Sequence, residues 1–403
     1  MNGGDKMNRE DFPMLKKDYI YFDNGATTYK PKCVIDEISN YYENYSVNAH
    51  RGDYDLSRCV DELYEDTRDL VKDFINAKKR EEIIFTKGTT ESMNMIVFGF
   101  MKNYLHKGDE VLITKTEHAS NVLPWFTLEK ELGIIVNYIP LDNLEVTLRD
   151  VKKVVNSNTK VISLAWITNT IGDIRPIKEI TEFAHENNIL MVVDGAQAVG
   201  HMKTDVQDLD IDFLAFSAHK MLGPTGVGVL YGKYHYLNNM LPINYGGGMN
   251  SIFESDKTLE YKELPLRLEA GTMNISGVLG FRQAIIYLNK IGMDKIENYE
   301  HELKKYLVNE LSKIDNVTVY NSHTTSGIVL FNINNIFAED TSQFLNHYHI
   351  CVRAGNHCAK MVKDEIGIKN TCRISLYFYN NKEEIDKFIQ VMKGNKDIFK
   401  VII

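Results

Sequence analysis

The sequence predicts an α/β protein with a large domain built on a mostly parallel sheet and a smaller α+β domain. Three observations predict this class. From about residue 81 onward, short apolar runs alternate with segments of helical periodicity. Several of these runs are apolar at consecutive positions, as expected for strands that are covered on both faces. With 403 residues, the chain is also longer than one hydrophobic core usually serves.

Six apolar runs in the first part of the chain are predicted strands, because each is short and ends in polar or turn-forming residues. They occupy residues 82–86, 110–114, 161–167, 189–194, 213–217 and 227–232. Between these runs, residues 90–105 and 177–188 carry apolar side chains at helical spacing. Strand and helix therefore alternate, as a parallel sheet requires.

The pattern changes after residue 274. A long helical stretch at 277–292 is followed by strand-like runs at 327–333, 349–355 and 372–379, and by a closing helix at 382–393. This succession predicts a smaller α+β domain. We therefore expect an N-terminal segment over residues 1–20, the large domain over 21–273 and the small domain over 274–403. The N-terminal segment is expected to pack with the small domain.

Charge and composition exclude several classes of function. The formal net charge of −9, with no basic stripe, argues against a nucleic-acid partner. No apolar stretch approaches the roughly 20 residues that cross a bilayer, and the N-terminus lacks the apolar segment of a secretory signal. Five scattered cysteines, an odd number, fit a reducing compartment better than a disulfide framework. We therefore expect a soluble, cytoplasmic protein without a membrane partner.

Polar side chains follow nearly every predicted strand. Ligands of open parallel sheets collect at the carboxyl ends of the strands, so these side chains are expected to share one site. Thr89 or Thr90 is expected to cap the next helix, whose first amides would face an anion such as phosphate. The other polar residues at these ends are Glu117, His118, Asn169, Asp194, Gln197, Ser217, His219 and Lys220.

Lys220 stands out because it follows the buried run 213–217, where a charge is costly. At its reference pKa, only about one lysine in 2,500 is neutral at pH 7, so a free lysine is a poor nucleophile. A Schiff base with a resident aldehyde avoids this problem, and burial lowers the cost further. Pyridoxal 5'-phosphate supplies such an aldehyde. It also carries a phosphate for Thr90, Ser217 and His219.

The remaining polar groups suit the ring of the same cofactor. Asp194 would keep the ring nitrogen protonated, so that the ring accepts electrons from the substrate α-carbon. His118 would stack on the ring face, and Gln197 would hydrogen-bond the ring oxygen. Taken together, the strand-end residues predict a pyridoxal-phosphate enzyme.

Eight motifs run nearly from end to end of the chain: "YFDNGATTYKP", "NAHRGDYDLS", "IIFTKGTTESMN", "TEHASNVLPW", "DGAQAVGH", "SAHKMLGPTGVGVLYG", "EAGTMN" and "RAGNHCA". In this order they resemble the class V aminotransferase family of pyridoxal-phosphate enzymes. The resemblance is specifically to group II cysteine desulfurases and their selenocysteine-lyase-like relatives. It implies pyridoxal-phosphate fold type I, with a large and a small domain, built as a homodimer.

The resemblance also implies roles for individual residues. Lys220 would be the Schiff-base lysine and His118 the ring-stacking acid or base. Thr272 would reach the phosphate of the neighbouring subunit, so that dimerisation completes the site. Asn169 and Arg373 would position the substrate carboxylate, for which the planar fork of arginine is suited. Thr89, Thr90, Ser217 and His219 would hold the phosphate, while Asp194 and Gln197 would hold the ring.

Cys358 in "RAGNHCA" matches the sulfur-accepting residue of the family. The implied reaction converts L-cysteine to L-alanine, with attack of the Cys358 thiolate on the substrate sulfur and a persulfide left on Cys358. A free thiol is only a few per cent ionised at neutral pH, so His357 or Arg353 is expected to lower the Cys358 pKa. The other cysteines, Cys33, Cys59, Cys351 and Cys372, are interpreted as small apolar side chains without a catalytic role.

Three positions depart from the family pattern. Asn356 stands where a histidine is usual, Tyr54 stands where a histidine is common, and Met249 stands where an acidic residue often follows the glycines. These departures are expected to affect acceptor docking, substrate preference or the dimer-side wall without touching the cofactor. By the same resemblance, sulfur passes to an acceptor protein. Iron–sulfur cluster assembly, tRNA and cofactor synthesis all stay open as its destination.

Three alternatives stay open. In the first, the chain is a selenocysteine lyase or another class V pyridoxal-phosphate lyase or transferase. Selenocysteine is the nearest rival substrate, since sulfur and selenium differ little in shape. In a second alternative, Cys351, His357, Cys358 and Cys372 ligate a structural metal, but no C-x-x-C spacing supports this, and no metal is expected. In a third, the chain is a cofactor-binding scaffold that has lost catalysis.

Overall fold

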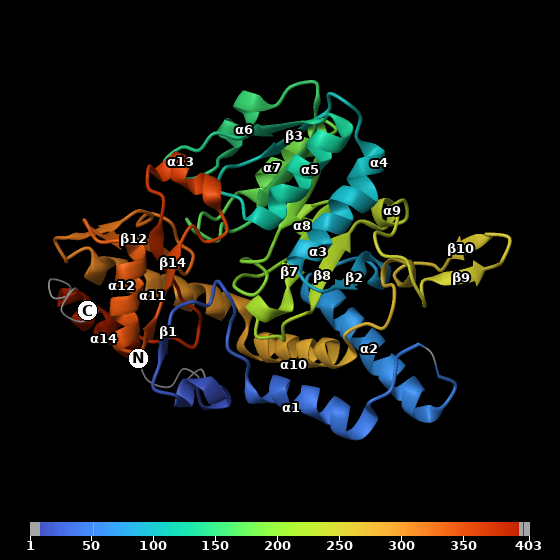
Figure 1. The fold of residues 1–403 in the computed structure, drawn as a ribbon, viewed down its shortest axis with the longest axis horizontal. Helices are drawn as coiled ribbons and strands as arrows, with labels where there is room; N and C mark the ends of the chain where they lie inside the picture. Colours follow the sequence, from blue (N-terminus) through green and yellow to red (C-terminus); the bar gives the residue numbers. More distant parts are fainter. Residues whose placement is uncertain (1–8, 51, 395–397, 399–403) are drawn as a thin grey trace.

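The structure is a computed structural model that describes residues 9–50, 52–394 and 398. Residues 1–8 of the predicted N-terminal segment and most of residues 395–403 of the predicted small domain lie outside this described part. The large sheet and its helices lie on one side of Figure 1, and the C-terminal helices and strands lie on the other side.

The large domain contains a seven-stranded sheet in the order β2-β8-β7-β6-β5-β3-β4. All neighbouring strands pair in parallel except those on either side of β8. The predicted α/β class with a mostly parallel sheet is therefore confirmed. The strands are β2 (Ile83–Thr86), β3 (Glu110–Ile113), β4 (Ile135–Tyr138), β5 (Thr159–Ala165), β6 (Leu190–Asp194), β7 (Phe213–Ser217) and β8 (Gly228–Gly232).

Two features of this sheet go beyond the sequence prediction. Strand β8 is antiparallel to both of its neighbours, whereas the prediction of a mostly parallel sheet assigned this strand no direction. The connection from β7 to β8 spans only residues 218–227, and a parallel crossover needs about a dozen residues or more. Strand β4 was not predicted because it lies at the sheet edge and half of its side chains are exposed.

Apolar side chains cover both faces of the sheet. Along β7, Phe213 and Ala215 join one core cluster, while Leu214 and Phe216 join the other. One face packs against α1 (Lys32–Asn40), α2 (Asp55–Phe74), α7 (Ile177–Glu186) and α10 (Ile275–Ile291). The other face packs against α3 (Thr89–Asn94), its π-helical continuation (Met95–Met101) and α5 (Leu123–Leu132). This two-sided burial explains the continuous apolar runs.

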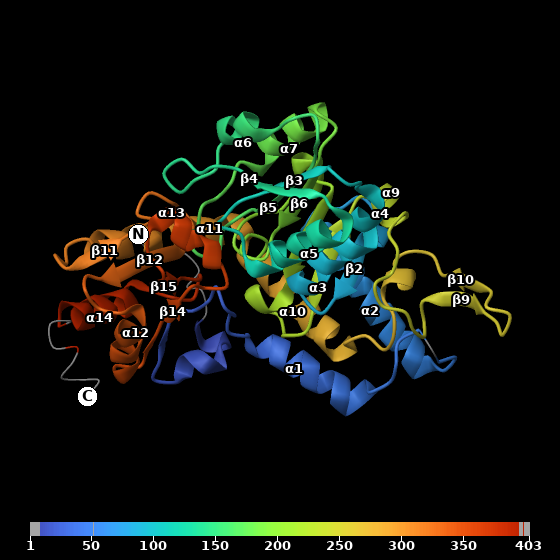
Figure 2. The same cartoon turned by 45° about the horizontal axis from the view of Figure 1, so that its top comes forward.

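Shorter elements complete the large domain. They are α4 (Lys102–Tyr104), α6 (Leu148–Val154), α8 (Val206–Leu209), α9 (Tyr234–Leu237) and the strands β9 (Asn250–Phe253) and β10 (Leu259–Tyr261). Strands β9 and β10 form an antiparallel hairpin that projects from the rest of the molecule (Figures 1 and 2). Its Phe253 side chain is 78% exposed.

The C-terminal part forms a four-stranded antiparallel sheet in the order β11-β12-β15-β14. The strands are β11 (Val317–Val319), β12 (Ile328–Ile333), β14 (Arg353–Gly355) and β15 (Thr371–Ser375). The helices of this part are α11 (Met293–Leu311), α12 (Ala338–His347), α13 (Lys363–Ile366) and α14 (Lys382–Lys393). Among the described residues, no helix has the length and apolarity that a membrane crossing requires.

The chain start and helix α10 connect the two parts. Strand β1 (Ile20–Tyr21) pairs with β13 (Ile350–Cys351), and Phe22 packs in the core of the small domain. Phe12 instead packs in a core cluster of the large domain. Helix α10 follows the predicted domain boundary at residue 274, but it packs against α1 and α2 of the large domain (Figure 1). The division of the chain into 21–273 and 274–403 therefore stays a prediction.

Candidate active site

The strand-end side chains gather around a cavity of about 240 Å³ between the large sheet and the small domain. All but one of the predicted site residues line this cavity. They are Thr89, Thr90, His118, Asn169, Asp194, Gln197, Ser217, His219, Lys220, Cys358 and Arg373. Thr272 does not line this cavity. It is exposed, and its hydroxyl accepts a hydrogen bond from the Asn48 side chain at 3.3 Å.

A larger cavity of about 310 Å³ lies next to this one and shares Gly25, Ile167 and Gln197 with it. Neither lysine nor cysteine is among its lining residues. The nucleophilic groups therefore belong to the smaller cavity, which we treat as the candidate active site.

Lys220 lies one turn beyond β7, and its accessible surface faces the cavity. Burial lowers the pKa of the Lys220 amine to about 8, which raises its neutral fraction at pH 7 to about one in ten. Asp194 is the last residue of β6, and burial raises the pKa of its carboxyl to about 6. The site thus pairs a lysine that readily becomes neutral with a carboxylate that remains mostly ionised at pH 7.

These pKa values predict how cofactor uptake depends on pH. Imine formation needs the neutral Lys220 amine, and pairing with a protonated ring nitrogen needs the ionised Asp194 carboxylate. Both deprotonated forms become more populated as pH rises. The rate at which apoprotein takes up pyridoxal phosphate should therefore increase from about pH 6 to about pH 8 and then level off. Stopped-flow absorbance of the bound cofactor measures this rate, and a rate that falls across this range would contradict the assignment.

The cavity end near α3 is built for an anion, though not through the predicted helix cap. Gly88 with φ of 150° is the cap residue, and neither Thr89 nor Thr90 caps α3 with its side chain. The Thr89 and Ser217 hydroxyls share a hydrogen bond of 2.7 Å, and the Thr89 amide donates to Ser217 at 2.8 Å. The Thr90 hydroxyl bonds Ser120, a lining residue that the sequence analysis missed, at 2.7 Å.

A glycine makes this arrangement possible. A Cβ on Gly228, at the start of β8, would lie 2.4 Å from the Gly88 Cα atom. The two backbones therefore approach each other closely only without side chains. This contact brings the hydroxyls of β7 and α3 together at the anion-binding end.

Two of the three histidines on the cavity wall, His118 and His219, are neutral at neutral pH. Burial and the nearby Lys220 charge lower the pKa of His118 to about 4, and the same causes lower that of His219 to about 4. The Ser120 amide donates to Nδ1 of His118 at 3.1 Å, so Nε2 carries its proton. The Gln197 amide is fixed by donation to the Gly25 carbonyl at 2.8 Å.

Arg373 is fully buried and lies at the small-domain side of the cavity. Its Nη2 pairs with Asp23 at 2.7 Å, and its Nη1 donates to the Asn169 carbonyl at 2.9 Å. Within the described part of the chain, Arg373 Nε and Asn169 Oδ1 have no partner although both are buried. A buried donor without a partner is costly, so Arg373 Nε suits a ligand carboxylate, whereas Asn169 Oδ1 is an acceptor and suits a ligand donor.

Cys358 is exposed and lines the same cavity. Both His357 and Cys358 adopt left-handed backbone conformations, with φ of 53° and 59°. Two hydrogen bonds hold this turn against the large domain. The Asn169 side chain donates to the His357 carbonyl at 2.6 Å, and the Ala119 amide donates to the Cys358 carbonyl at 2.8 Å. The large domain thus fixes the backbone that presents the thiol.

The prediction that His357 supplies a positive charge to Cys358 is wrong. His357 is buried, and burial together with the Arg373 and Arg353 charges lowers its pKa to about 3. Its imidazole is therefore neutral. Arg353, the other residue named in that prediction, lines the same cavity as Cys358.

The remaining cysteines do not line this cavity. Cys372 is buried, and its thiol donates to the Ala338 carbonyl at 3.2 Å. Cys33, Cys59 and Cys351 are half-buried. In the described ranges, no three His, Cys, Asp or Glu side chains gather as metal ligands would, which argues against the structural-metal alternative.

The three departures from the family pattern lie in different places. Asn356 accepts the Cys358 amide at 3.2 Å and so supports the cysteine turn. Tyr54 is exposed at the start of α2, and Met249 is buried with its sulfur 3.3 Å from the Gly246 amide. Only Asn356 is next to the reactive groups.

The residues present fit pyridoxal phosphate. One end of the cavity offers hydroxyls and a glycine turn for a phosphate, and the centre offers Lys220 for an aldehyde. Asp194 lies where a ring nitrogen needs a carboxylate, and the buried Arg373 Nε lacks an acceptor at the opposite end. The donor set thus matches a phosphorylated, aldehyde-bearing ring together with a substrate carboxylate.

Comparison with known proteins agrees with this reading. The family model described as "Aminotransferase class-V" matches residues 20–388. A probable cysteine desulfurase of Halalkalibacterium halodurans is 41% identical, with 96% of this chain and 97% of that protein aligned. A cysteine desulfurase of Haloferax volcanii is 39% identical, over 94% of this chain and 90% of its own.

Solved structures show the same similarity. The apo cysteine desulfurase from Thermococcus onnurineus superposes with a TM-score of 0.92 at 37% identity, and 96% of each chain is covered. The cysteine desulfurase CsdA from Escherichia coli, in an S-sulfonic acid form, has a TM-score of 0.91 at 31% identity. It covers 97% of this chain and 98% of its own.

Proposed function

This chain belongs to the class V aminotransferase family, and we propose that it is a pyridoxal-phosphate-dependent cysteine desulfurase that uses Cys358 as its sulfur acceptor. It converts L-cysteine to L-alanine, and its fold is pyridoxal-phosphate fold type I. One observation carries the assignment of roles. Lys220 of the large domain and Cys358 of the small domain line the same cavity, and buried polar groups without partners lie between the domains there.

The residues of this chain would hold the cofactor at three points. Lys220 would bond its aldehyde and Asp194 its ring nitrogen, while Gln197 and His118 would orient the ring. When bound, pyridoxal phosphate supplies an electron sink for the substrate α-carbon. The phosphate would be held by the group Thr89, Thr90, Ser217 and His219.

The substrate is positioned from the small-domain side. Arg373 would bind the carboxylate of L-cysteine, because its Nε lacks an acceptor, and Asn169 would position that arginine through its backbone carbonyl. The Lys220 amine, which is readily neutral, would then move the proton of the α-carbon. Cys358 lines the same cavity and would accept sulfur from the substrate thiol there.

Cys358 completes the reaction. Its thiolate attacks the substrate sulfur, so that an S–S bond forms as the Cβ–S bond breaks. The electron pair of the broken bond stays with carbon, which is later protonated to give L-alanine. The sulfur remains on Cys358 as a persulfide. Because Cys358 is exposed, an acceptor protein can reach this persulfide directly.

A homodimer completes the site in this proposal. Thr272 is exposed and does not line the cavity of its own subunit, so it is available to the phosphate of a partner subunit. The projecting β9–β10 hairpin and its exposed Phe253 offer apolar surface for the same contact. We also propose a cytoplasmic location, and iron–sulfur cluster assembly as one destination of the sulfur.

The proposed reaction leaves a covalent mark that a direct experiment detects. Purified holoprotein is incubated with L-cysteine, then alkylated, digested and analysed by mass spectrometry. We expect one added sulfur atom on the peptide that contains Cys358, together with L-alanine in solution. Peptides that contain Cys33 or Cys59 serve as internal controls and should stay unmodified. Alanine without sulfur on Cys358 would leave the enzyme class intact and contradict the role of Cys358.

A further inference from the structure

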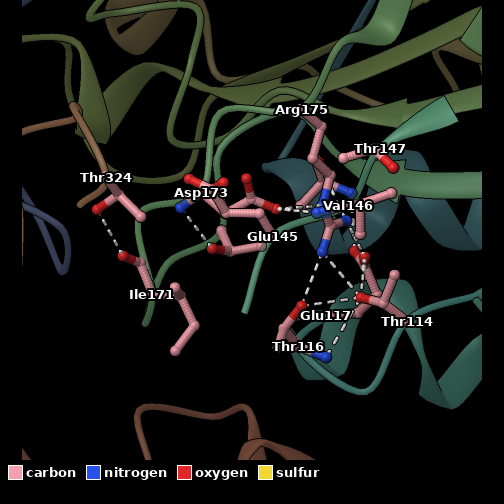
Figure 3. A network of polar contacts seen from close by, with 12 residues as sticks. Thr114, Thr116, Glu117, Glu145, Val146, Thr147, Ile171, Asp173, Arg175 and Thr324 are labelled. Carbon is pink, nitrogen blue, oxygen red and sulfur yellow. Dashed lines mark hydrogen bonds and ion pairs between the residues drawn. The ribbon is translucent and has the colours of Figure 1, made fainter. Parts of the chain in front are cut away.

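Arg175 is the largest charged side chain beside the active site that the proposed reaction does not use. It is 1% exposed, does not line the cavity, and lies at the centre of a polar network (Figure 3). Its Nη1 forms an ion pair with Glu117, and its Nη2 donates to the Thr114 and Thr116 hydroxyls at 2.8 and 2.7 Å. The guanidinium therefore closes the turn that leaves β3.

Glu117 connects Arg175 to the loop that carries His118. Its Oε2 accepts the Ala165 amide at the end of β5 and the Asn121 side chain, both at 2.8 Å. The two acceptor oxygens of one carboxylate thus join Arg175, β5 and the segment just beyond His118. The next residue, Ala119, holds the Cys358 carbonyl.

Arg175 also holds a second loop, through Asp173. Its Nε pairs with Asp173 at 3.3 Å. Asp173 in turn closes a tight turn with Thr168: the Thr168 amide donates to the Asp173 carbonyl at 3.2 Å, and the Asp173 amide donates to the Thr168 hydroxyl at 3.1 Å. This turn carries Asn169, which holds the His357 carbonyl.

The small domain contacts the same turn from the other side. The Ile171 carbonyl accepts from Asn321 at 2.6 Å and from Thr324 at 3.2 Å, the latter visible in Figure 3. Ser326 donates to the Gly172 carbonyl at 2.8 Å. The turn at residues 168–173 is therefore clamped between Arg175 and the domain that presents Cys358.

From these contacts we propose that Arg175 is a positioning residue for the sulfur-transfer reaction. One guanidinium fixes both loops that bear on the site, the one that presents His118 and the one that presents Asn169. Through Ala119 and Asn169, these loops hold the strained backbone of His357 and Cys358. The inference rests on the proposed function, because Cys358 is the sulfur acceptor there.

Charge gives the network a second effect. Burial is the main cause that raises the pKa of Asp194; in addition, the Glu117 charge raises this pKa and the Arg175 charge lowers it, so the two charges act in opposite directions on Asp194. Loss of the Arg175 charge would leave Glu117 as a buried, uncompensated anion. The pKa of Asp194 would then rise, and the pH dependence of the bound cofactor would shift toward higher pH.

Three variants test the proposal. Arg175→Lys keeps the positive charge but loses the planar guanidinium with its several donors, and Arg175→Met loses both. Glu117→Gln removes the negative charge of the partner while retaining the shape of its side chain. We expect kcat/KM for L-cysteine to fall about 10²-fold in Arg175→Met and less in Arg175→Lys, since small misplacements of reacting groups cost this much. The alkylation rate of Cys358 in the resting enzyme should rise in each variant, because the cysteine turn is held less firmly.

A matched control separates positioning from stability. Asp212 is a buried carboxylate just before the amino-terminal end of β7, paired with Lys233 and His185 at 2.9 Å. Asp212→Asn should lower the melting temperature, as the Arg175 variants do. It should leave kcat/KM, Cys358 alkylation and the cofactor titration unchanged per folded molecule.

The outcomes are distinguishable. If Arg175→Met does not fold, Arg175→Lys and Glu117→Gln carry the test. A wild-type alkylation rate of Cys358 in the variants that fold, or a wild-type cofactor titration in Arg175→Met, would overturn the positioning role, even if turnover is reduced. These two readouts do not need turnover. A wild-type enzyme that forms no persulfide would instead refute the proposed function, and the alkylation comparison would still decide the role of Arg175.

Discussion

Replacement of Lys220 by alanine is expected to abolish alanine release from L-cysteine, with a fall in kcat of at least about 10³-fold. The side chain has two tasks, to bond the cofactor and to move the proton of the substrate α-carbon. Burial that lowers its pKa to about 8 serves both tasks, because each needs a neutral amine. Loss of the amine removes both together. Alanine release measures the loss of turnover, and the visible absorbance of protein loaded with one pyridoxal phosphate per chain measures the loss of the imine. Borohydride trapping in the wild-type protein identifies the lysine that carries the cofactor.

Lys304 provides a matched control for this prediction. It is also a buried lysine, and burial lowers its pKa to about 7, but it does not line the active-site cavity. Its amine bonds the Thr324 hydroxyl. Lys304→Met should keep the cofactor adduct on Lys220, and the wild-type protein should show no adduct on Lys304. A trapped cofactor adduct on Lys304, at one cofactor per chain, would mean that a lowered pKa alone determines which lysine bonds the cofactor. It would contradict the assignment of Lys220 as the Schiff-base lysine.

Much of the fold follows from the apolar pattern of the sequence. Two-sided burial produces continuous apolar runs, and six of the seven strands of the large sheet are visible for this reason. Strand β4 was missed since an edge strand buries only part of its side chains and resembles a loop. The direction of β8 could not be predicted from its apolar run, because burial looks the same in parallel and antiparallel strands. Only the short connection at 218–227 distinguishes them.

The candidate site was predictable for a different reason. Parallel strands bring their carboxyl ends to one edge, so residues such as Asp194 and Lys220 meet without any long-range information. Contacts between loops do not follow from that rule. The network of Arg175 with Glu117 and Asp173 depends on how three turns fold over one another, and the sequence offered no pattern for it.

Protonation states were the least predictable property. His357 stands beside Cys358 in the sequence, which suggested a local positive charge. In the fold it is buried near two arginines, and both effects favour the neutral imidazole. Of the two residues predicted to influence Cys358, His357 is thus neutral because burial and the two arginine charges set its protonation state, and sequence adjacency does not report either effect.

Replacement of Cys358 by alanine is expected to remove desulfurase activity while leaving the cofactor site intact. Cys358 touches the large domain through its backbone carbonyl, which alanine retains, so the Ala119 contact should persist. The bound cofactor should therefore keep its absorbance and its adduct on Lys220. Cysteine-dependent alanine release should fall at least about 10²-fold, because no other thiol lines the cavity. Cys351→Ala, a half-buried cysteine of β13, is the control and should keep full activity.

The same variant discriminates between L-cysteine and selenocysteine as the natural substrate. Selenium leaves carbon more readily than sulfur, so release of selenium needs less help from a thiolate. Cys358→Ala should therefore lose cysteine turnover while retaining a larger share of alanine release from selenocysteine. Equal loss with both substrates would mean that Cys358 is needed for both. Unchanged cysteine turnover would show that Cys358 is not the acceptor, and the persulfide chemistry assigned to this cavity would have to be abandoned.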